Sequence, residues 1–384
     1  MRILIVDHYA GASHQRGLYR TLAGLEGANV TLLIPDRWND GFIEVTGEEE
    51  TSGNFRVIAG QTVFRGRTHR AVTFGLWSLL RKHDFDLLYL NAEPENFQTL
   101  YAIIGRRLLA PSLPIILMSW RNIEFPQGVY PYRAPFLHSV CERFTATTID
   151  ALVAHNEAAK SIFSSKGLKQ IEMIPPWVDT EVFAPGSKAD GKRRLGITGY
   201  TIGYAGRLVA EKGVDLLFQA SAGLKFPHEV LVVGAGPEEK PLRTLAAKLG
   251  ISHRIHWIGP IPKGYLAQHL QAMDVLVLPS RTTPLWIEQF GRILIETMSC
   301  GVPVIGSDSG EIPRTIGSAG LIFPEGDASA LTFQLERMHD DPVLSEELSN
   351  RSRDRAESVF STKVVAGLYL SFFNSVCSAK LLDS

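Results

Sequence analysis

Cysteine is scarce in this chain, and its three cysteines lie far apart. Cys141, Cys300 and Cys377 show neither the C-x-x-C nor the C-x-x-H spacing that holds zinc or carries out thiol exchange. This set excludes a disulfide-rich secreted scaffold and favours a reducing, cytoplasmic compartment.

Long apolar runs are also missing. The longest candidate, TLYAIIGRRLLAPSLPIILM, is interrupted by Arg106, Arg107 and two prolines, and the apolar run at the N-terminus stops at Asp7. A membrane span needs roughly 18 apolar residues, and the N-terminal run is too short for the core of a signal peptide. We expect neither a span nor a signal peptide, while peripheral contact with the inner face of a membrane stays open.

Charge of one sign is not in excess. Lys and Arg number 39, Asp and Glu number 40, the net charge is −1, and hydrophobic residues make up 45% of the 384 residues. This composition indicates a globular protein whose main partner is not nucleic acid. The length exceeds what one core usually reaches, so we expect two domains.

Short apolar runs bounded by Gly, Pro, Asn or Asp alternate with longer amphipathic stretches. This alternation predicts βα units and an α/β fold with two doubly wound parallel sheets in tandem. The expected strands of the first half are Arg2–Val6, Val30–Ile34, Arg56–Ile58, Leu87–Leu90, Ile115–Met118, Ala151–Ala154 and Ile171–Ile174. Those of the second half are Thr201–Tyr204, Val230–Val233, Ile255–Trp257, Val275–Leu278, Val304–Ile305 and Leu321–Phe323.

A segment rich in Gly, Pro and charge separates the two halves. We expect an N-terminal domain over residues 1–180, a linker over 181–199 and a C-terminal domain over 200–361. Residues 362–384 should contain a helix that crosses back toward the N-terminal domain, because apolar residues recur there at helical spacing. These residues are Val365, Leu368, Tyr369, Phe372, Phe373 and Val376.

Two motifs of the second half carry chemistry. AGRLVAEKG, residues 205–213, places Arg207 and Lys212 beside Gly206 just before a helix, which suits a diphosphate. WIEQFGRILIETMSCGVPV, residues 286–304, turns at Phe290 and Gly291 into a helix whose first amides point above the sheet.

Two glutamates accompany this second motif. Glu288 precedes the helix and Glu296 lies on it, and a carboxylate that accepts two hydroxyl hydrogen bonds can hold a ribose or a hexose. A hydrolase is disfavoured, because eight helical residues span about 12 Å and glycosidase carboxylates stand roughly 5 to 9.5 Å apart.

Two weaker patterns point to other chemistry. Asp84 and Asp86 match a D-x-D metal motif, yet they precede an expected strand instead of ending one. Gly234 and Gly236 begin like a dinucleotide fingerprint whose third glycine is missing. We therefore expect neither a bound metal nor a nicotinamide cofactor.

Together the motifs resemble the retaining glycosyltransferases of the GT-B fold that carry the E-x7-E motif, the group 1 glycosyl transferases of family four. The family pattern E-x-F-G-x-x-x-x-E stands here as Glu288, Phe290, Gly291 and Glu296. AGRLVAEKG, SDSGEIPRTI and GLIFPEGD are similar to further segments of the family. The resemblance implies two Rossmann-like domains that face a central cleft, with the acceptor on the first and the nucleotide sugar on the second.

The resemblance also implies a role for individual residues. Arg207 and Lys212 would act on the diphosphate and Glu288 on the donor sugar, and these three would be the catalytic residues. The donor site would further contain Gly11, Gly206, Gly259, Ile261, Phe290, Gly291, Arg292, Ile293 and Glu296. The nucleotide-diphosphate sugar is a substrate, and the resemblance implies no cofactor and no metal.

The chain departs from the family on the acceptor side. The loop after the first strand has the single Gly11 where the family often has two glycines, and Trp120, Arg121 and Asn122 replace an often-found histidine. We expect the acceptor, a glycan, a lipid-linked sugar or a small molecule, near these three residues and His14. The cluster of Arg65, Arg67, His69 and Arg70 is either a solvated surface or a site for anionic lipid or a phosphorylated acceptor.

The implied activity is retaining, metal-independent sugar transfer in polysaccharide or glycoconjugate biosynthesis. Two alternatives remain: a nucleotide-sugar epimerase on the same fold, and a non-catalytic subunit that binds a nucleotide sugar. Release of nucleotide diphosphate only when an acceptor is supplied would separate the transferase from the epimerase.

Overall fold

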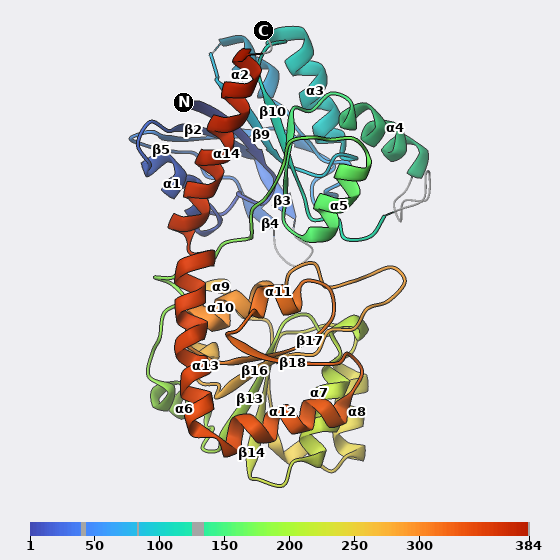
Figure 1. Cartoon of the computed structure of the whole chain (residues 1–384), viewed down its shortest axis with the longest axis vertical. Helices are drawn as coiled ribbons and strands as arrows, with labels where there is room; N and C mark the ends of the chain where they lie inside the picture. The colour runs from blue at the N-terminus through green and yellow to red at the C-terminus, as the bar shows by residue number, and fades with distance from the viewer. Residues whose placement is uncertain (40–43, 83, 125–133, 383–384) are drawn as a thin grey trace. The chain divides into compact units, whose positions relative to one another are not determined.

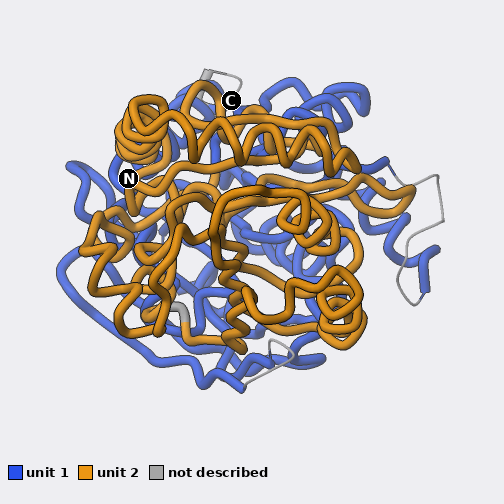
Figure 2. Tube along the Cα trace, turned by 90° about the horizontal axis from the view of Figure 1, so that it is seen from below, with its two compact units in different colours: residues 1–175, 362–384 blue, residues 176–361 orange. Residues whose placement is uncertain are grey.

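The computed structural model of the protein describes residues 1–39, 44–82, 84–124 and 134–382. The chain divides into two compact units, which Figure 2 colours separately. Unit 1 comprises residues 1–175 and 362–384, and unit 2 comprises residues 176–361. Each unit has its own mainly parallel sheet with helices around it (Figure 1), so the expected α/β fold is confirmed.

The main sheet of unit 1 has eight strands in the order β12-β11-β10-β9-β1-β2-β6-β5. Its strands are β1 Arg2–Asp7, β2 Asn29–Pro35, β5 Glu50–Ser52, β6 Phe55–Gly60, β9 Leu87–Asn91, β10 Ile115–Ser119, β11 Ala151–Ala154 and β12 Ile171–Met173. The short strand β5 pairs antiparallel with β6 and was not predicted. Two further pairs, β3 Arg37–Asn39 with β4 Glu44–Thr46 and β7 Thr62–Val63 with β8 Val72–Thr73, were also not predicted.

Both faces of this sheet are buried, which explains its uninterrupted apolar strands. In β1, Leu4 and Val6 join a core with helices α2, α3 and α5, while Ile3 and Ile5 point to the opposite face. Figure 1 shows α1 and α14 on one side of unit 1 and α3, α4 and α5 on the other. The helices of unit 1 are α1 Gly17–Gly24, α2 Leu76–Lys82, α3 Phe97–Leu109, α4 Pro135–Ala146, α5 Glu157–Ser165 and α14 Thr362–Leu382.

Helix α14 completes the core of unit 1 from the end of the chain. The rings of Tyr369 and Phe373 pack on Tyr89 of β9, with centroids 5.5 and 5.3 Å away, and the two tyrosine hydroxyls lie 3.1 Å apart. The helix begins at Thr362 as predicted. Of the six apolar residues expected to pack, Leu368 differs, because it is 41% exposed.

Unit 2 has a six-stranded parallel sheet in the order β15-β14-β13-β16-β17-β18. Its strands are β13 Tyr200–Ala205, β14 His228–Val233, β15 Ile255–Ile258, β16 Val275–Leu278, β17 Val304–Ser307 and β18 Gly320–Phe323. Its helices are α6 Lys188–Leu195, α7 Val214–Gly223, α8 Glu239–Lys248, α9 Lys263–Leu270, α10 Arg292–Ser299, α11 Ile312–Ile316, α12 Ala328–Asp340 and α13 Pro342–Arg355. All thirteen strands expected from the sequence are present in the two units.

The segment expected as a linker, residues 181–199, instead belongs to unit 2 and contains helix α6. Ser187 caps this helix by accepting a hydrogen bond from the amide of Asp190. Gly191 lies in the middle of this helix, and a Cβ there would lie 3.0 Å from the Cβ of Ala272. The glycine therefore allows the helix to lie close against the chain after α9.

Candidate functional site

The central strand of unit 2 marks the position of the candidate site. Strand β13 lies between β14, which follows it in the chain, and β16, which comes later. The loops that leave the carboxyl ends of β13 and β16 therefore run in opposite directions. In open α/β sheets ligands bind at this switch point.

The loop after β13 carries Gly206, Arg207 and Lys212. Arg207 is exposed, and its carbonyl oxygen accepts a hydrogen bond of 2.7 Å from the hydroxyl of Tyr204. Burial, and secondly the nearby Glu288 carboxylate, raise the pKa of the Tyr204 phenol, so it remains a donor at neutral pH. Lys212 closes a short 3₁₀ helix, Ala210–Lys212, directly before α7.

Lys212 and Glu288 are in direct contact. The Nζ atom of Lys212 lies 2.5 Å from Oε2 of Glu288, and the hydroxyl of Ser280, just after β16, donates to the same oxygen at 2.8 Å. Glu288 is only 6% exposed, and the Lys212 ammonium also lies 4.8 Å from the ring centroid of Trp286. The ion pair is therefore mostly shielded from solvent, and it lies at the carboxyl edge of the sheet.

The loop that holds Glu288 is fixed from the other side by residues 309–311. The amide of Glu311 donates to the carbonyl oxygen of Glu288 at 3.2 Å. Gly310 has a φ of +53°, and a Cβ there would lie 2.1 Å from the same oxygen. Only glycine fits this position without displacing Glu288. The SDSGEIPRTI segment thus positions Glu288, whereas the role of Ser280 was not predicted from the sequence.

Helix α10 begins at Arg292, directly after Gly291. Its first amides have no partner inside the helix, as at any helix N-terminus. The preceding Phe290 is held by the Thr315 hydroxyl, which donates to its carbonyl oxygen at 2.8 Å. Glu296, one turn into the helix, is 8% exposed, while Arg292 is exposed and Ile293 is half-buried.

The remaining donor residues expected in unit 2 lie in the loop after β15. Gly259 is exposed and Ile261 is half-buried. This strand is two places from β13 in the sheet, and its carboxyl end points to the same edge because the strands are parallel. The expected donor residues of unit 2 therefore all lie on loops or a helix start at one edge of one sheet.

The other expected site residues belong to unit 1. Gly11 follows β1, and its carbonyl oxygen accepts a bond of 2.6 Å from Arg16, a fully buried residue that also donates to Ala10. Arg16 thus shapes this loop, a role that no motif predicted. His14 lies in the same loop and is exposed.

Arg121 occupies a different setting from the one expected. Its side chain is 3% exposed and pairs with Glu95 at 2.5 Å and with Glu142 of α4. The charge of this arginine is therefore used inside unit 1, which argues against contact with an acceptor. The ring of its neighbour Trp120 packs at a tilt of 43° against His155, with ring centroids 4.2 Å apart, and Asn122 is half-buried.

The two aspartates of the D-x-D pattern lie at the amino ends of the strands, opposite the carboxyl edge of the sheet. Asp86 precedes β9 and accepts bonds from the backbone and side chain of Arg2 at 2.6 and 3.0 Å. Asp84 also faces Arg2. Within the described residues no group of three or more His, Cys, Asp or Glu is arranged to hold a metal ion.

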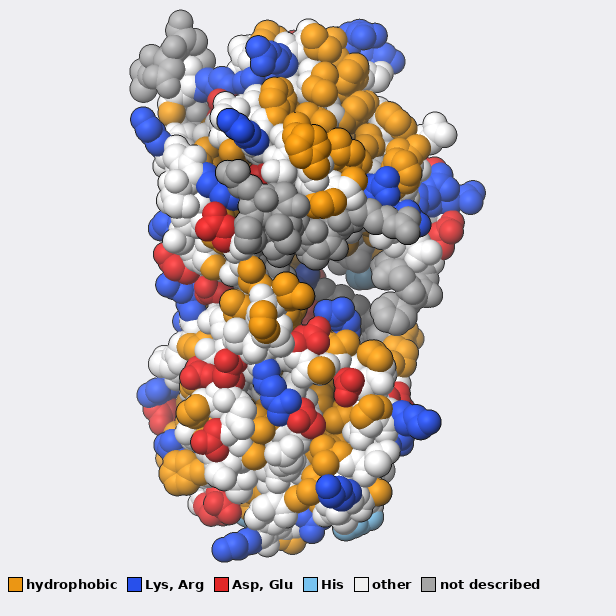
Figure 3. Space-filling model, turned by 90° about the vertical axis from the view of Figure 1, so that its right-hand side faces the viewer, with side chains coloured by type: hydrophobic (Ala, Val, Ile, Leu, Met, Phe, Trp, Pro, Cys, Tyr) orange, Lys and Arg blue, Asp and Glu red, His pale blue; other side chains and the backbone are white. Residues whose placement is uncertain are grey.

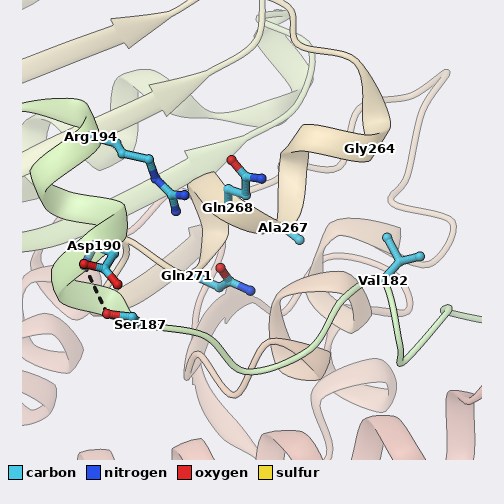
Figure 4. A pocket seen from close by; sticks show the side chains of 8 residues that line it. All are labelled: Val182, Ser187, Asp190, Arg194, Gly264, Ala267, Gln268 and Gln271. Atoms are coloured by element: carbon cyan, nitrogen blue, oxygen red, sulfur yellow. Dashed lines mark hydrogen bonds between the residues drawn. The ribbon is translucent and has the colours of Figure 1, made fainter.

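A separate hollow of about 390 Å³ lies between α6 and α9 of unit 2 (Figure 4). Asp190 and Arg194 line it from α6, Ser187 from the cap of that helix, and Val182 from the segment before it. Gly264, Ala267 and Gln268 line it from α9, and Gln271 directly after that helix. None of these residues belongs to the expected donor site. As for the membrane, none of the helices within the described ranges is both long and apolar enough to cross one.

Comparison with known proteins yields one family. The model of the family described as Glycosyl transferases group 1 matches residues 188–355. The chain is 32% identical over 248 residues to the D-inositol 3-phosphate glycosyltransferase of Acidothermus cellulolyticus, and this match spans 59% of the chain and 53% of that relative. The chain thus spans about half the length of this relative.

A second relative and two solved structures are matched over more of their length. Sucrose-phosphate synthase from Thermosynechococcus elongatus has a TM-score of 0.72 at 20% identity, over 99% of this chain and all of that one. The UDP complex of Anabaena HepE has a TM-score of 0.71 at 17% identity, over 98% of this chain and all of that one, and both show the fold alone. The GDP-mannose-dependent alpha-(1-6)-phosphatidylinositol monomannoside mannosyltransferase of Mycolicibacterium smegmatis is 33% identical over 305 residues, 77% of this chain and 78% of the relative. With the family model covering the sheet that holds Lys212 and Glu288, this extent of identity shows that the chain belongs to the group 1 glycosyltransferases.

Proposed function

We propose that this protein transfers a sugar from a nucleotide-diphosphate sugar to a hydroxyl of a glycan, lipid-linked or small-molecule acceptor, with retention of configuration. The observation that carries the proposal is the sheltered contact of Lys212 and Ser280 with Glu288 at the β13–β16 switch point. Exposed Arg207 and the start of α10 lie at the same edge.

These groups suit a leaving diphosphate. Departure of the nucleotide diphosphate builds negative charge, which Arg207, Lys212 and the amides at the start of α10 can neutralise without a metal ion. Glu288 would then accept hydroxyl hydrogen bonds from the donor sugar and Glu296 from the ribose. We assign Gly206, Gly259, Ile261, Phe290, Gly291, Arg292 and Ile293 to the same donor site.

The relatives suggest which substrates to try first. The Mycolicibacterium relative is named for GDP-mannose and a phosphatidylinositol mannoside, and other relatives are named for inositol phosphate. We infer that a GDP- or UDP-linked hexose is the donor and that the acceptor belongs to a glycoconjugate.

Donor and acceptor turnover can be tested together. The purified protein is supplied with GDP-mannose or UDP-glucose, and release of GDP or UDP is measured with and without inositol lipids and glycan extracts. We expect acceptor-dependent release that falls at least about tenfold in Arg207→Ala, Lys212→Ala and Glu288→Ala. Lys240→Ala, an exposed lysine of α8, is the matched control.

Each other outcome has a definite meaning. Full activity in all three variants would exclude this donor site. A change of the donor sugar without release would identify an epimerase, and donor binding without any turnover would identify a non-catalytic binding subunit.

We further propose that unit 1 contacts an anionic membrane from the cytoplasmic side. Phe136, Leu137 and Val140 of α4 are 73%, 50% and 49% exposed, and Leu108 of α3 is 67% exposed. Figure 3 shows hydrophobic side chains gathered on one face of unit 1. The exposed Arg107 and Arg143 lie on the same two helices, so apolar and cationic groups are combined as at a lipid surface.

Sedimentation with lipid vesicles tests this contact. Binding to vesicles of phosphatidylglycerol and phosphatidylcholine should exceed binding to phosphatidylcholine alone. Phe136→Ser should weaken binding about tenfold, because burying a phenylalanine contributes roughly 1.5–3 kcal/mol. Phe333→Ser, an exposed phenylalanine of α12 in unit 2, should have no effect, and equal loss in both variants would argue against the contact.

A further inference from the structure

Unit 1 has a switch point of its own. Strand β1 lies between β2, which follows it in the chain, and β9, which comes later. Tyr9 stands two residues after β1, and Glu93 stands two residues after β9. Both side chains therefore start at the carboxyl edge of the sheet, where ligands bind in folds of this kind.

The carboxylate of Glu93 is held in one orientation. The hydroxyl of Ser119, the last residue of β10, donates to Oε2 at 2.6 Å, and the amide of Trp120 donates to Oε1 at 2.6 Å. The side chain remains only half-buried. Since each carboxylate oxygen accepts more than one hydrogen bond, both oxygens retain capacity for a ligand hydroxyl.

The surroundings of Glu93 raise its pKa toward neutral pH. Burial, and secondly the Glu95 carboxylate, raise the pKa of Glu93 to about 7, while the Arg121 guanidinium acts in the opposite direction. Arg121 is shared between Glu95 and Glu142, so it does not serve Glu93 alone. Glu93 is thus a carboxyl group whose charge changes near neutral pH.

Tyr9 lies at the same carboxyl edge of the sheet as Glu93. Tyr9 is 47% exposed, and its hydroxyl lies 3.0 Å from Oγ1 of Thr68. Burial raises the pKa of Tyr9, and the Asp7 and Glu93 carboxylates add to the shift, so the phenol lies within the field of Glu93. The carboxylate can accept hydrogen bonds from hydroxyls, and the exposed ring of Tyr9 at the same edge offers an apolar face to C–H groups.

We propose that Glu93, with Tyr9 beside it, binds a hydroxyl group of a sugar or polyol acceptor at the β1–β9 switch point. This inference rests on the proposed transferase function. It places the acceptor contact at Glu93, whereas the sequence analysis expected it near Arg121. Arg121 becomes a positioning residue, because it holds Glu95 and the loop that carries Glu93. If Glu93 served only to link β9 to β10 through hydrogen bonds, its ionisation would not change the affinity of the protein for a soluble polyol.

Saturation-transfer NMR with methyl α-D-mannopyranoside and myo-inositol as probes tests the inference. We expect Glu93→Ala to lower the affinity for at least one probe about tenfold or more, as loss of a charged hydrogen bond does. Glu172→Gln, an exposed carboxyl of β12, is the matched control and should bind like the unmodified protein.

The pH dependence separates ligand contact from a structural role. An ionised carboxylate forms the stronger hydrogen bond, so affinity for the probe should rise from pH 6 to pH 8 and should be flat in Glu93→Gln. Glu93→Gln also carries the test if Glu93→Ala does not fold. Equal affinity in the Glu93 variants, a pH dependence that survives Glu93→Gln, or no binding of either probe at 100 mM, roughly 100 times a millimolar dissociation constant, would overturn the proposal.

Failure of this proposal can be told apart from failure of the proposed function. Calorimetry with GDP and UDP reports on unit 2, and we expect the Glu93 variants to bind nucleotide normally. Normal nucleotide binding with unchanged polyol binding would overturn only the role of Glu93. Absence of nucleotide binding in the unmodified protein would count against the transferase itself.

Discussion

The two units use the same sheet geometry and place different chemistry on it. At the switch point of unit 2, Lys212 pairs with Glu288, exposed Arg207 lies in the same loop as Lys212, and helix α10 begins at Arg292. At the switch point of unit 1, the groups are Glu93, held by the Trp120 amide, and the exposed phenol of Tyr9. The parallel strands are alike in both units, so the ligands that we propose, a diphosphate at one edge and hydroxyl groups at the other, depend on the loops.

The largest change in the stability of one unit relative to the other should follow from replacing Arg121 in unit 1. Arg121→Ala leaves the buried Glu95 without the cation that pairs with it, while Glu142 keeps its contact with Lys166 at 2.6 Å. Breaking a buried ion pair in this way typically costs about 3–5 kcal/mol. Thermal unfolding should then show a melting transition of unit 1 well below that of unit 2. Arg143→Ala, an exposed arginine of α4, is the control, and a single unchanged transition in Arg121→Ala would show that the ion network does not support unit 1.

A change to the ion pair of unit 2 should affect catalysis more than nucleotide binding. Glu288→Gln keeps the shape of the side chain but removes the charge next to Lys212, and we expect turnover to fall about 100-fold, or roughly 2.7 kcal/mol. Nucleotide binding should persist, since the cations remain. Measured kcat and GDP affinity check this, and an equal loss in both would assign Glu288 to general binding instead of the sugar.

The stability of unit 1 should depend on pH through the ionisation of Glu93. Because the pKa of Glu93 is raised, its stabilising contribution is complete below the usual value of 4.5 and is lost as pH rises toward 7. The melting temperature of Glu93→Gln, relative to the unmodified protein, should therefore increase between pH 4.5 and pH 7 and stay level above it. Glu172→Gln should show no such trend, and a difference that is constant with pH would contradict the raised pKa.

The smallest effect should follow from the hydrogen bond that anchors α14. Tyr369→Phe removes the partner of the buried Tyr89 hydroxyl, 3.1 Å away, and should lower the stability of unit 1 by about 1 kcal/mol. Denaturant unfolding measures the change. Tyr265→Phe, an exposed tyrosine of α9, should change nothing, and a loss in unit 2 would contradict the assignment of α14 to unit 1.

The parallel strands and the Lys212–Glu288 pair lie within reach of sequence analysis, because both depend on local patterns. Apolar runs of four to seven residues predict strands directly, and the two motif residues follow strands that must end at one edge. Glu93 was missed because its partners, Ser119 and Trp120, become neighbours only when β9 and β10 pair. An isolated glutamate after a strand carries no such information.

Arg121 and α6 show why other expectations differ from the structure. An arginine that follows a strand is equally consistent with a ligand contact and with a buried ion pair, and only the positions of Glu95 and Glu142 decide between them. In α6, the content of glycine and charged residues suggested a linker. Helix propensity takes no account of tertiary contacts, so it could not predict that Gly191 lets the helix pack closely against Ala272.

Helix α14 makes unit 1 discontinuous, and this has a consequence for biosynthesis. Residues 1–175 leave the ribosome first, yet the partner of Tyr89 is translated only after the whole of unit 2. Unit 2 is contiguous and can complete its fold during synthesis, whereas the face of β9 that receives α14 stays uncovered until residues 362–382 have been translated. Unit 2 can therefore fold before unit 1 is complete, although most of unit 1 precedes it in the chain.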